Sequence, residues 1–484
     1  MAGITKRFGS VVALESVDLH VEAQTIHAVV GENGAGKTTL MRILYGALKA
    51  DSGVYELNGQ LASFGSTKQA IAHGIGMVSQ HYAIIPELTA LENLTLGAEG
   101  GVLLNKGANE RIAEELATRM GFRFDWNRPA AELSPAGAQK LEILKLLWRR
   151  AQIMILDEPT AMLSPADGDA LFESLHKLVR EGATVILVTH RLPEVLDHCK
   201  SVTVLRGGML IEEKGVSQTS ARELARLIIG GDLPEHELRA VVAPGEPVLE
   251  LENVSATGDR GHEALKGVSL SVRSGEIVGV AGVDGSGQRE LFQAIAGLTK
   301  STGRLAFGGS STSARLRAGL RIIPEDRHHE GVIESWSLDE NSALGLQRLA
   351  PLAKGRSIDV AARRKWSQAV ADRFKTKHGG LNLPMASLSG GNQQRFVAAR
   401  AIGFEPKLLL AFQPARGLDL GSTVDVYRGI RQTCDSGAGA LVVSFDLDEL
   451  LEHCDRIVVM NNGRLVEAGS KDRDQIGRLM VGAE

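Results

Sequence analysis

The stretch Gly31-Glu32-Asn33-Gly34-Ala35-Gly36-Lys37-Thr38-Thr39 decides how this 484-residue chain folds. It matches the pattern G-x-x-x-x-G-K-[ST], which is typical of a loop that binds phosphate groups. The apolar residues 25–30 before it predict a buried strand, and residues 39–44 after it predict the start of a helix. Glycines let backbone N–H groups turn towards phosphate oxygens, and a helix N-terminus adds partial positive charge. We therefore expect these nine residues to bind a nucleotide rather than to form an ordinary glycine-rich turn.

Two side chains of this loop and two carboxylates further along have the chemistry of phosphoryl transfer. Lys37 would hold the β- and γ-phosphates, and the Thr38 hydroxyl would bind Mg²⁺. The apolar run 153–156 predicts a strand that ends in Asp157 and Glu158. Asp157 would coordinate Mg²⁺ through water, and Glu158 would orient or deprotonate the attacking water. A single acid at a strand end is commonplace, but this pair together with Lys37 favours catalysis.

Two further polar residues follow predicted strands. Gln80 comes after residues 76–78, where its amide is placed to reach both the metal and the attacking water. His190 ends the run 188–190 and is placed to contact the γ-phosphate. Alone, each would more often be a polar strand end than a ligand. They are candidate ligands only because Lys37 and the pair Asp157-Glu158 accompany them.

Composition limits the classes of protein to consider. The length exceeds what one hydrophobic core usually holds, and 43% apolar with 23% charged residues is typical of a soluble globular chain. No run approaches the ~18 apolar residues of a membrane span, and the N-terminus lacks a secretory signal pattern. A net charge of −4 argues against nucleic acid as the main partner. The three cysteines show no paired spacing, so we expect reduced thiols rather than zinc sites or disulfides.

The chain also repeats itself. Residues 13–19 (ALESVDL) return as residues 264–270 (ALKGVSL), and Asp157-Glu158-Pro159-Thr160 returns as Phe412-Gln413-Pro414-Ala415. We therefore predict two homologous α/β domains, residues 1–233 and 248–484, joined by a linker at residues 234–247 that contains three prolines. Each alternates strand-like and helical runs, which is typical of a mostly parallel sheet flanked by helices. A helical insertion is expected between residues 80 and 134.

The alignment of the two halves leaves a gap at the N-terminus. Met1 corresponds to Glu252, so the predicted strand at residues 248–251 has no counterpart before Met1. We expect either that the first domain lacks its first edge strand or that the chain starts upstream of this Met1.

The ordered set of motifs resembles the nucleotide-binding domain of ABC ATPases. The set comprises Lys37, Gln80, Leu133-Ser134, Asp157-Glu158 and His190, and residues 388–395 (LSGGNQQR) closely match the signature motif of that family. The resemblance covers nearly the whole chain, once per half. It implies two tandem P-loop ABC ATPase domains, each a mostly parallel sheet core with an antiparallel subdomain and a helical insertion. ATP and Mg²⁺ are the implied ligands.

The same resemblance implies roles for residues far from the phosphate loop. In this family two domains pair head to tail, so the signature of one faces the nucleotide on the other. An intramolecular pairing would then bring Ser389, Gly390, Gly391 and Asn392 to the γ-phosphate of ATP held by the first half. Phe8 falls where the family stacks an aromatic ring on adenine, a buried core phenylalanine being the alternative.

The second half departs from the family pattern at each catalytic position. Gln288-Arg289 replaces Lys37-Thr38, Phe412-Gln413 replaces Asp157-Glu158, Phe445 replaces His190, and Glu325 replaces Gln80. The signature motif is intact in the second half and departs from the family pattern in the first half. There Ala136 takes the place of a family glycine, and its Cβ would crowd a phosphate. Head-to-tail pairing would therefore give one working site and one degenerate site.

These features resemble the fused ATPase subunits of ABC importers for small hydrophilic solutes. The stretch 77–82, Gln288 and the stretch 411–419 favour the nucleoside branch over a sugar importer of the ribose or galactose type. The implied partners are integral-membrane permeases and, through them, an extracytoplasmic solute-binding protein, with the chain peripheral at the cytoplasmic face of the membrane. No nucleic acid is expected. Residues 81–86 and 327–332 are predicted to contact the permeases.

Two other classes of ABC protein remain as alternatives. A tandem ABC ATPase acting on ribosomes usually keeps two intact sites and a long, charged linker, and this chain shows neither. A DNA-repair ABC protein would carry long coiled-coil heptads or cysteine-rich insertions.

Overall fold

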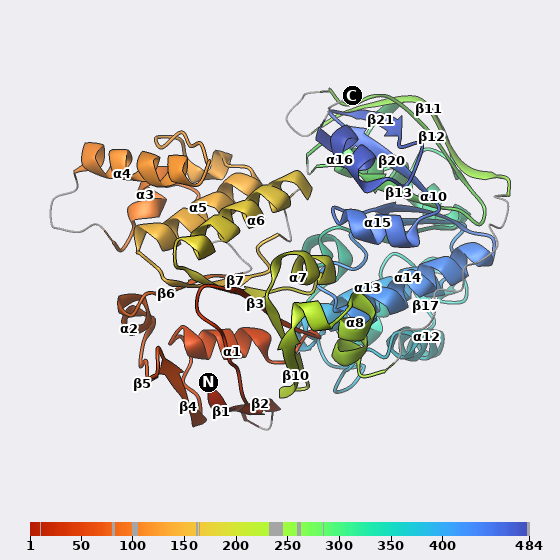
Figure 1. The fold of residues 1–484 in the computed structure, drawn as a ribbon. Coiled ribbons are helices and arrows are strands. Elements are labelled where there is room, and N and C mark those ends of the chain that lie inside the picture. Colours follow the sequence, from red (N-terminus) through yellow and green to blue (C-terminus); the bar gives the residue numbers. More distant parts are fainter. Residues whose placement is uncertain are drawn as a thin grey trace. The chain divides into compact units, whose positions relative to one another are not determined.

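A computed structural model describes the chain from residue 1 to 484, except residues 10, 80–82, 99–104, 161–162, 164, 232–244, 259–262, 284 and 482–484. It contains two compact units, Met1–Glu235 and His236–Glu484 (Figure 1). Most of the predicted linker at residues 234–247 lies outside the described residues, so its boundaries remain a prediction.

A six-stranded sheet forms the centre of the first unit. Its strand order is β10-β9-β3-β8-β7-β6, and all neighbours are parallel except the hairpin of β9 and β10. Every residue of β3 and β8 is buried, which explains why their sequences are continuous apolar runs rather than alternating ones. The strands are β3 (Ile26–Gly31), β6 (Ile75–Val78), β7 (Ile153–Asp157), β8 (Thr184–Val188), β9 (Ser201–Arg206) and β10 (Met209–Gly215).

Helices cover this sheet on two sides, with α1 on one side and α5 and α6 on the other (Figure 1). Helix α1 begins at Lys37, two residues before the predicted start, because Gly36 takes the N-cap position with a left-handed φ of 99°. The helical insertion predicted between residues 80 and 134 is present as α3 and α4, and α5 follows directly after it. The helices are α1 (Lys37–Leu44), α2 (Thr67–Ala72), α3 (Ala90–Thr95), α4 (Lys106–Arg119), α5 (Pro135–Trp148), α6 (Pro165–Arg180), α7 (Leu192–His198) and α8 (Ala221–Ile229), with short helices η1 (Ala130–Glu132) and η2 (Val216–Gln218).

A second, antiparallel sheet of the first unit corrects one expectation from the sequence. Its order is β2-β1-β4-β5, with β1 (Ala2–Phe8), β2 (Val11–Val17), β4 (Ser52–Leu57) and β5 (Gln60–Ala62). Strand β1 lies between β2 and β4, so the expected loss of a first edge strand is wrong. The strand is present, lies inside the sheet, and has 7 residues where its counterpart β11 has 11.

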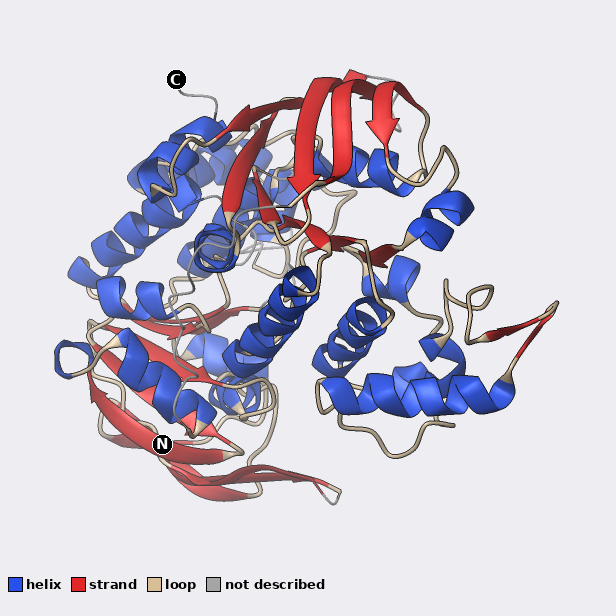
Figure 2. Ribbon diagram, turned by 90° about the vertical axis from the view of Figure 1, so that its right-hand side faces the viewer, coloured by secondary structure: helices blue, strands red, loops and turns tan. Residues whose placement is uncertain are grey.

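The second unit repeats this architecture (Figure 2). Its main sheet has the order β15-β18-β19-β13-β20-β21, which matches the first unit strand for strand, and its antiparallel sheet has the order β12-β11-β14. The strands are β11 (Pro247–Thr257), β12 (Glu263–Arg273), β13 (Ile277–Ala281), β14 (Ser301–Ala306), β15 (Leu320–Ile323), β16 (Ala353–Lys354), β17 (Ser357–Ile358), β18 (Leu408–Phe412), β19 (Gly439–Val443), β20 (Arg456–Asn461) and β21 (Arg464–Glu467).

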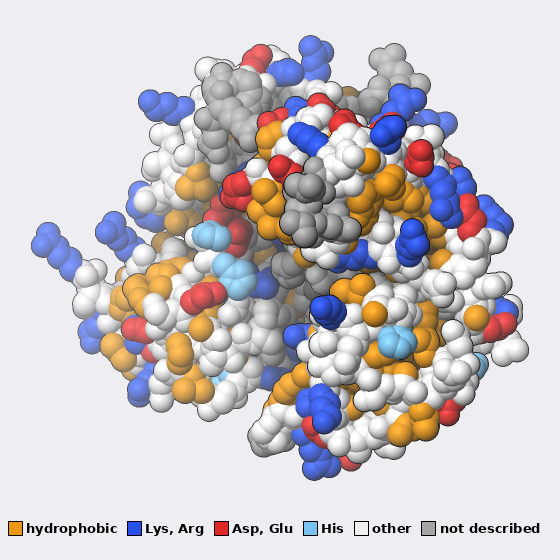
Figure 3. All heavy atoms as spheres, turned by 90° about the vertical axis from the view of Figure 1, so that its left-hand side faces the viewer, with side chains coloured by type: hydrophobic (Ala, Val, Ile, Leu, Met, Phe, Trp, Pro, Cys, Tyr) orange, Lys and Arg blue, Asp and Glu red, His pale blue; other side chains and the backbone are white. Residues whose placement is uncertain are grey.

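The helices of the second unit also follow the order of the first. They are α9 (Gln288–Ala296), α10 (Thr312–Ala318), α11 (Leu338–Ser342), α12 (Val360–Arg373), α13 (Gly390–Gly403), α14 (Leu420–Asp435), α15 (Leu447–His453) and α16 (Arg473–Val481), with the π-helical turn η3 (Arg327–Gly331) and the 3-10 turn η4 (Met385–Ser387). Among the described helices, none combines the length and apolar character needed to cross a bilayer. On the face drawn in Figure 3, basic, acidic and apolar side chains are interspersed.

Candidate functional site

The phosphate loop of the first unit joins the carboxyl end of β3 to the N-terminus of α1. Its three glycines adopt positive φ angles of 155° at Gly31, 85° at Gly34 and 99° at Gly36. A Cβ at Gly31 would lie 2.2 Å from the carbonyl oxygen of Leu205, whereas one at Gly34 would meet no atom within 4 Å. Packing therefore requires glycine at Gly31, and backbone conformation alone requires it at Gly34. The first N–H groups of α1 have no side-chain cap and are available to an anion.

Lys37 and Thr38 begin α1 and connect the loop to the next strands. The buried ammonium group of Lys37 donates hydrogen bonds to the carbonyl oxygens of Gly31 (2.7 Å) and Glu32 (3.0 Å). The hydroxyl of Thr38 donates to Oδ2 of Asp157 over 3.2 Å. The loop and the acid pair, predicted from distant parts of the sequence, therefore meet at one point.

The acid pair lies at the carboxyl end of β7. Burial, reinforced by the negative charge of Glu158, raises the pKa of Asp157 to about 6, and the Thr38 hydrogen bond and the charge of Lys37 only partly oppose this. The backbone of Glu158 has a φ of 51°, and its N–H donates to the carbonyl oxygen of Val188 at 2.8 Å. Two adjacent carboxylates and a hydroxyl are hard oxygen ligands, which fit a divalent cation such as Mg²⁺.

His190 follows β8 and contacts the second acid of the pair. Its Nδ1 lies 3.1 Å from Oε1 of Glu158, and 40% of the histidine side chain is exposed against 16% of the glutamate. Glu194, which the sequence analysis did not single out, holds both segments in place. Its carboxylate accepts hydrogen bonds from the hydroxyls of Thr160 and Thr189, the latter at 2.9 Å. An acidic residue in the first turn of α7, five positions after a threonine, was the available signal.

Phe8 and Gln80 are two further residues that the sequence analysis placed at the site. Phe8 ends β1, where 49% of its surface is exposed and the ammonium group of Lys6 lies 5.6 Å from the ring centre. The ring is therefore not part of the core, and stacking on adenine stays a prediction. Gln80 lies outside the described residues.

The second unit keeps the backbone of the phosphate loop but not its chemistry. Gly282, Gly285 and Gly287 have φ angles of 153°, 81° and 115°. Gln288 stands where the first unit has Lys37, and its buried amide donates to the carbonyl oxygen of Val283 at 3.1 Å. Arg289 stands where the first unit has Thr38 and bonds the carboxylate of Glu330 at 2.9 Å.

The acid pair of the second unit is replaced by an aromatic cluster. Phe412 lies 5.6 Å from Phe292 and 5.9 Å from Phe445, measured between ring centres, and both contacts are edge-on. The next residue, Gln413, retains the backbone geometry of Glu158, with a φ of 50° and an N–H bond of 2.7 Å to the carbonyl of Val443. The two units therefore differ in the side chains at this strand end and share its backbone conformation.

The two signature segments differ in how their serines are used. Ser134 accepts a hydrogen bond from the N–H of Gly137 and so caps α5. Ser389 is exposed and makes no such cap on α13; its hydroxyl oxygen accepts from the Asn392 amide at 3.0 Å. A Cβ at Gly391 would make only an ordinary contact of 3.5 Å, so packing within the unit does not require that glycine. The first turn of α13 thus keeps its N–H donors free for a ligand.

A glycine-rich phosphate loop, an acid pair and a histidine on neighbouring parallel strands, and a helical insertion together define an ATP-binding cassette. The family model described as ABC transporter matches residues 14–161 and 265–415. The chain therefore belongs to the ABC transporter family, with two fused ATP-binding domains, and the predicted fold class is confirmed. It binds ATP and is an ATP hydrolase of that family.

Full-length relatives support the same assignment. The Glucose import ATP-binding protein TsgD13 of Haloferax volcanii is 40% identical, with 100% of this chain and 95% of that protein covered. The Nucleoside import ATP-binding protein NupA of Lactococcus lactis subsp. cremoris is 38% identical, with 100% and 97% covered. A solved chain from the complex of archaeal ribosomal stalk protein aP1 and ribosome recycling factor aABCE1 aligns over 96% of this chain and 89% of its own, with a TM-score of 0.68. At 19% identity that likeness shows the fold alone.

Proposed function

We propose that this chain is the ATPase subunit of an importer for a small hydrophilic solute, either a nucleoside or a sugar. Its similarity over the full length to import ATP-binding proteins carries the proposal. In that role it docks, peripherally and at the cytoplasmic face, on integral-membrane permeases that receive solute from an extracytoplasmic binding protein. Of the segments predicted to meet the permeases, residues 83, 85 and 86 are exposed in the first unit, as are residues 328–330 in the second.

One set of residues performs hydrolysis in this proposal. Lys37 and the first turn of α1 hold the β- and γ-phosphates, while Thr38 and Asp157 hold Mg²⁺, with Gln80 reaching the same metal. Bound Mg²⁺ supplies a positive charge that stabilises the charge developing on the phosphates. Glu158 accepts a proton from the attacking water, and His190, in contact with Glu158, orients that carboxylate and contacts the γ-phosphate.

The signature of the second unit completes this site. In the proposed head-to-tail pairing, Ser389, Gly390, Gly391 and Asn392 contact the γ-phosphate of ATP bound at Lys37. The exposed Ser389 hydroxyl and the free N–H groups of α13 supply the donors. The degenerate loop at Gln288 would face the worn signature at Ser134.

Steady-state ATP hydrolysis by the assembled complex tests these roles. Glu158→Gln should lower turnover by about 10²–10⁴, because it removes a positioned proton acceptor and keeps the side-chain shape. Ser389→Arg should be nearly as damaging, since it places a cation and a long side chain at the γ-phosphate. The double variant should be little worse than Glu158→Gln alone, as expected for residues that act as one unit.

Ser134→Arg is the matched control for the pairing. It carries the same substitution at the equivalent serine, which would face the degenerate loop, so hydrolysis should change far less. If Ser134→Arg abolished turnover and Ser389→Arg spared it, the head-to-tail assignment would be wrong.

The class of solute needs a separate measurement. Cells that lack the chain should lose uptake of radiolabelled nucleosides or of sugars, and the chain, but not Glu158→Gln, should restore it. Loss of neither uptake would refute the importer proposal.

A further inference from the structure

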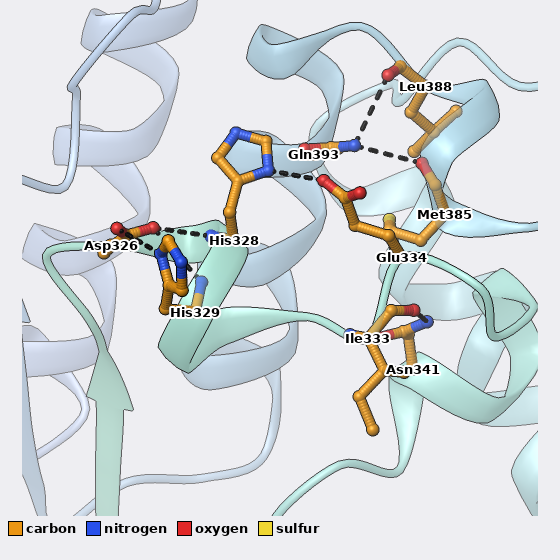
Figure 4. A network of polar contacts seen from close by, with 9 residues as sticks. All are labelled: Asp326, His328, His329, Ile333, Glu334, Asn341, Met385, Leu388 and Gln393. Atoms are coloured by element: carbon orange, nitrogen blue, oxygen red, sulfur yellow. Dashed lines mark hydrogen bonds and ion pairs between the residues drawn. The ribbon is translucent and has the colours of Figure 1, made fainter.

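The loop that follows β15 contains an insertion relative to its counterpart after β6. In both loops a buried asparagine fixes an equivalent residue from both sides: Asn93 exchanges hydrogen bonds with the backbone of Ile85, and Asn341 does so with Ile333. Ile85 follows the end of β6 by seven residues, whereas Ile333 follows the end of β15 by ten. The three additional residues lie in the segment that forms η3 (Figure 4).

Charged side chains hold η3 in one conformation. Asp326 accepts hydrogen bonds from the backbone N–H groups of His328 and His329 and contacts the His329 ring at 2.7 Å. The His328 ring contacts Glu334 at 2.7 Å, and both histidines lie beside their carboxylates in Figure 4. Beneath the segment, the buried guanidinium of Arg400 donates to the carbonyl oxygen of Gly331 at 2.8 Å. These hydrogen bonds attach η3, which we call the platform, to Asp326 after β15, to Glu334 and to Arg400 of α13.

This platform directs Arg327 to the start of the signature helix. The Nη2 atom of Arg327 lies 2.5 Å from where a Cβ of Gly390 would be, and its Nη1 lies 3.9 Å from the Cβ position of Gly417. The guanidinium thus occupies space that the missing side chain of Gly390 leaves open, whereas its approach to the Gly417 position is an ordinary van der Waals contact. In the first unit Pro135 stands in the position of Gly390, and residues 79–84 contain no arginine or lysine.

The guanidinium of Arg327 is partly buried. Its Nε is buried without a hydrogen-bond partner, and among the described residues no carboxylate lies within ion-pair distance of its guanidinium. Burial, together with the positive charge of Arg416, lowers the pKa of Arg327, and Asp326 only partly opposes this. The same guanidinium adjoins the positive end of the 14-residue helix α13. Three positive contributions therefore converge where an anion would relieve their repulsion.

We propose that Arg327 is a further ATP-binding residue, which places its charge beside Gly390 to receive the γ-phosphate of a nucleoside triphosphate. This inference rests on the proposed head-to-tail pairing. It gives a function to an arginine that lies outside the signature motif and reaches the first residue of the signature helix. Because the γ-phosphate is the group recognised, Arg327 should distinguish ATP from ADP.

Affinities of the full chain for ATP and ADP, measured by titration calorimetry in a Glu158→Gln background, test the inference. Arg327→Ala should weaken ATP binding about tenfold and change ADP binding by less than about twofold, because only ATP carries the recognised phosphate. Arg327→Lys should restore part of the ATP affinity, since it keeps the charge and loses the planar group. Arg304→Ala, at an exposed arginine on β14, is the control and should change neither affinity.

Ser389→Arg in the same assay separates the two proposals. If it weakens ATP binding while Arg327→Ala does not, the pairing stands and the role of Arg327 is refuted. If neither variant affects ATP binding, the head-to-tail pairing fails. An equal loss of ATP and ADP affinity in Arg327→Ala would indicate a purely structural role and would also overturn the inference.

Discussion

Lys37 and Gln288 begin equivalent helices, and each donates a hydrogen bond from its side chain to a carbonyl of the loop before it. The local packing of the two loops therefore does not depend on which residue is present. What differs is the positive charge of Lys37, which lowers the pKa of Asp157 and which we expect to act on a bound phosphate. We therefore expect that exchanging this one residue removes catalysis and leaves the fold in place.

Lys37→Gln, which copies the second unit, should test this separation. We expect the melting temperature to change by less than about 2 °C, because the glutamine amide can make the same loop contact. ATP hydrolysis should fall by at least about 10²-fold, since the charge that stabilises the phosphates is lost. Gln288→Lys is the reverse control and should create no second active site, because Phe412 and Gln413 remain. A Lys37→Gln chain with a tenth or more of normal activity would contradict the assignment.

The equivalent strands β3 and β13 bury side chains of different chemistry at the same position. In β3 the ring of His27 is fully buried and contacts the hydroxyls of Ser201 at 2.7 Å and Thr203 at 2.8 Å, both on β9. At the corresponding position of β13 lies Val278. Burial, with a smaller effect from the charge of His20, lowers the pKa of His27 to about 4.

This buried histidine should make the first unit sensitive to acid. The unfolded chain takes up a proton near the ordinary histidine pKa of about 6.5, whereas the folded chain does so only near 4. The stabilisation is therefore complete above pH 6.5 and declines as pH falls towards 4, by at most about 1.4 kcal/mol per pH unit. Hydrogen exchange of β3 amides, corrected for intrinsic rates, should show this slope. His27→Val/Thr203→Val should flatten it, and an unchanged slope would exclude His27 as the cause.

The elements that the sequence predicted well are those whose signal is local. Strands such as β3 and β8 are buried along their whole length, so each is a continuous apolar run, and the loop before Lys37 needs glycines at fixed positions. Contacts between distant segments have no such signal. The bond of Glu194 to Thr160, which lies 34 residues earlier in the chain, and the approach of Arg327 to Gly390 depend on how loops fold back onto strands.

At the scale of the whole molecule, duplication followed by unequal change produced two units with one fold and different chemistry. In the proposed function the first unit supplies the catalytic side chains, and the second supplies the uncapped signature serine Ser389 and Arg327. Each unit alone lacks part of the equipment for hydrolysis in the proposed pairing. Activity should then belong to the chain as a whole rather than to either half.

This division predicts the number of nucleotides hydrolysed. Trapping the assembled complex with vanadate after turnover should capture one hydrolysed nucleotide per chain. The second unit lacks the lysine of the phosphate loop and both acids at the end of the neighbouring strand. The second loop should bind nucleotide more weakly, through the amides around Gly285 and Gly287. Quantifying the trapped ADP distinguishes one working site from two, and two hydrolysed nucleotides per chain would contradict the proposed single working site.

The aromatic cluster around Phe412 has a consequence for the evolution of this chain. Restoring an aspartate there alone would bury a carboxylate between Phe292 and Phe445 with no lysine to balance it, which is costly. Restoring a threonine at Arg289 alone would remove the guanidinium that Glu330 bonds. The aspartate is the costly step, because the Arg289–Glu330 pair is exposed and contributes little stability, so we expect an acid to return only after a lysine has replaced Gln288. The aromatic cluster therefore makes the order of these substitutions matter, and we expect descendants of this chain to keep the difference between the two units.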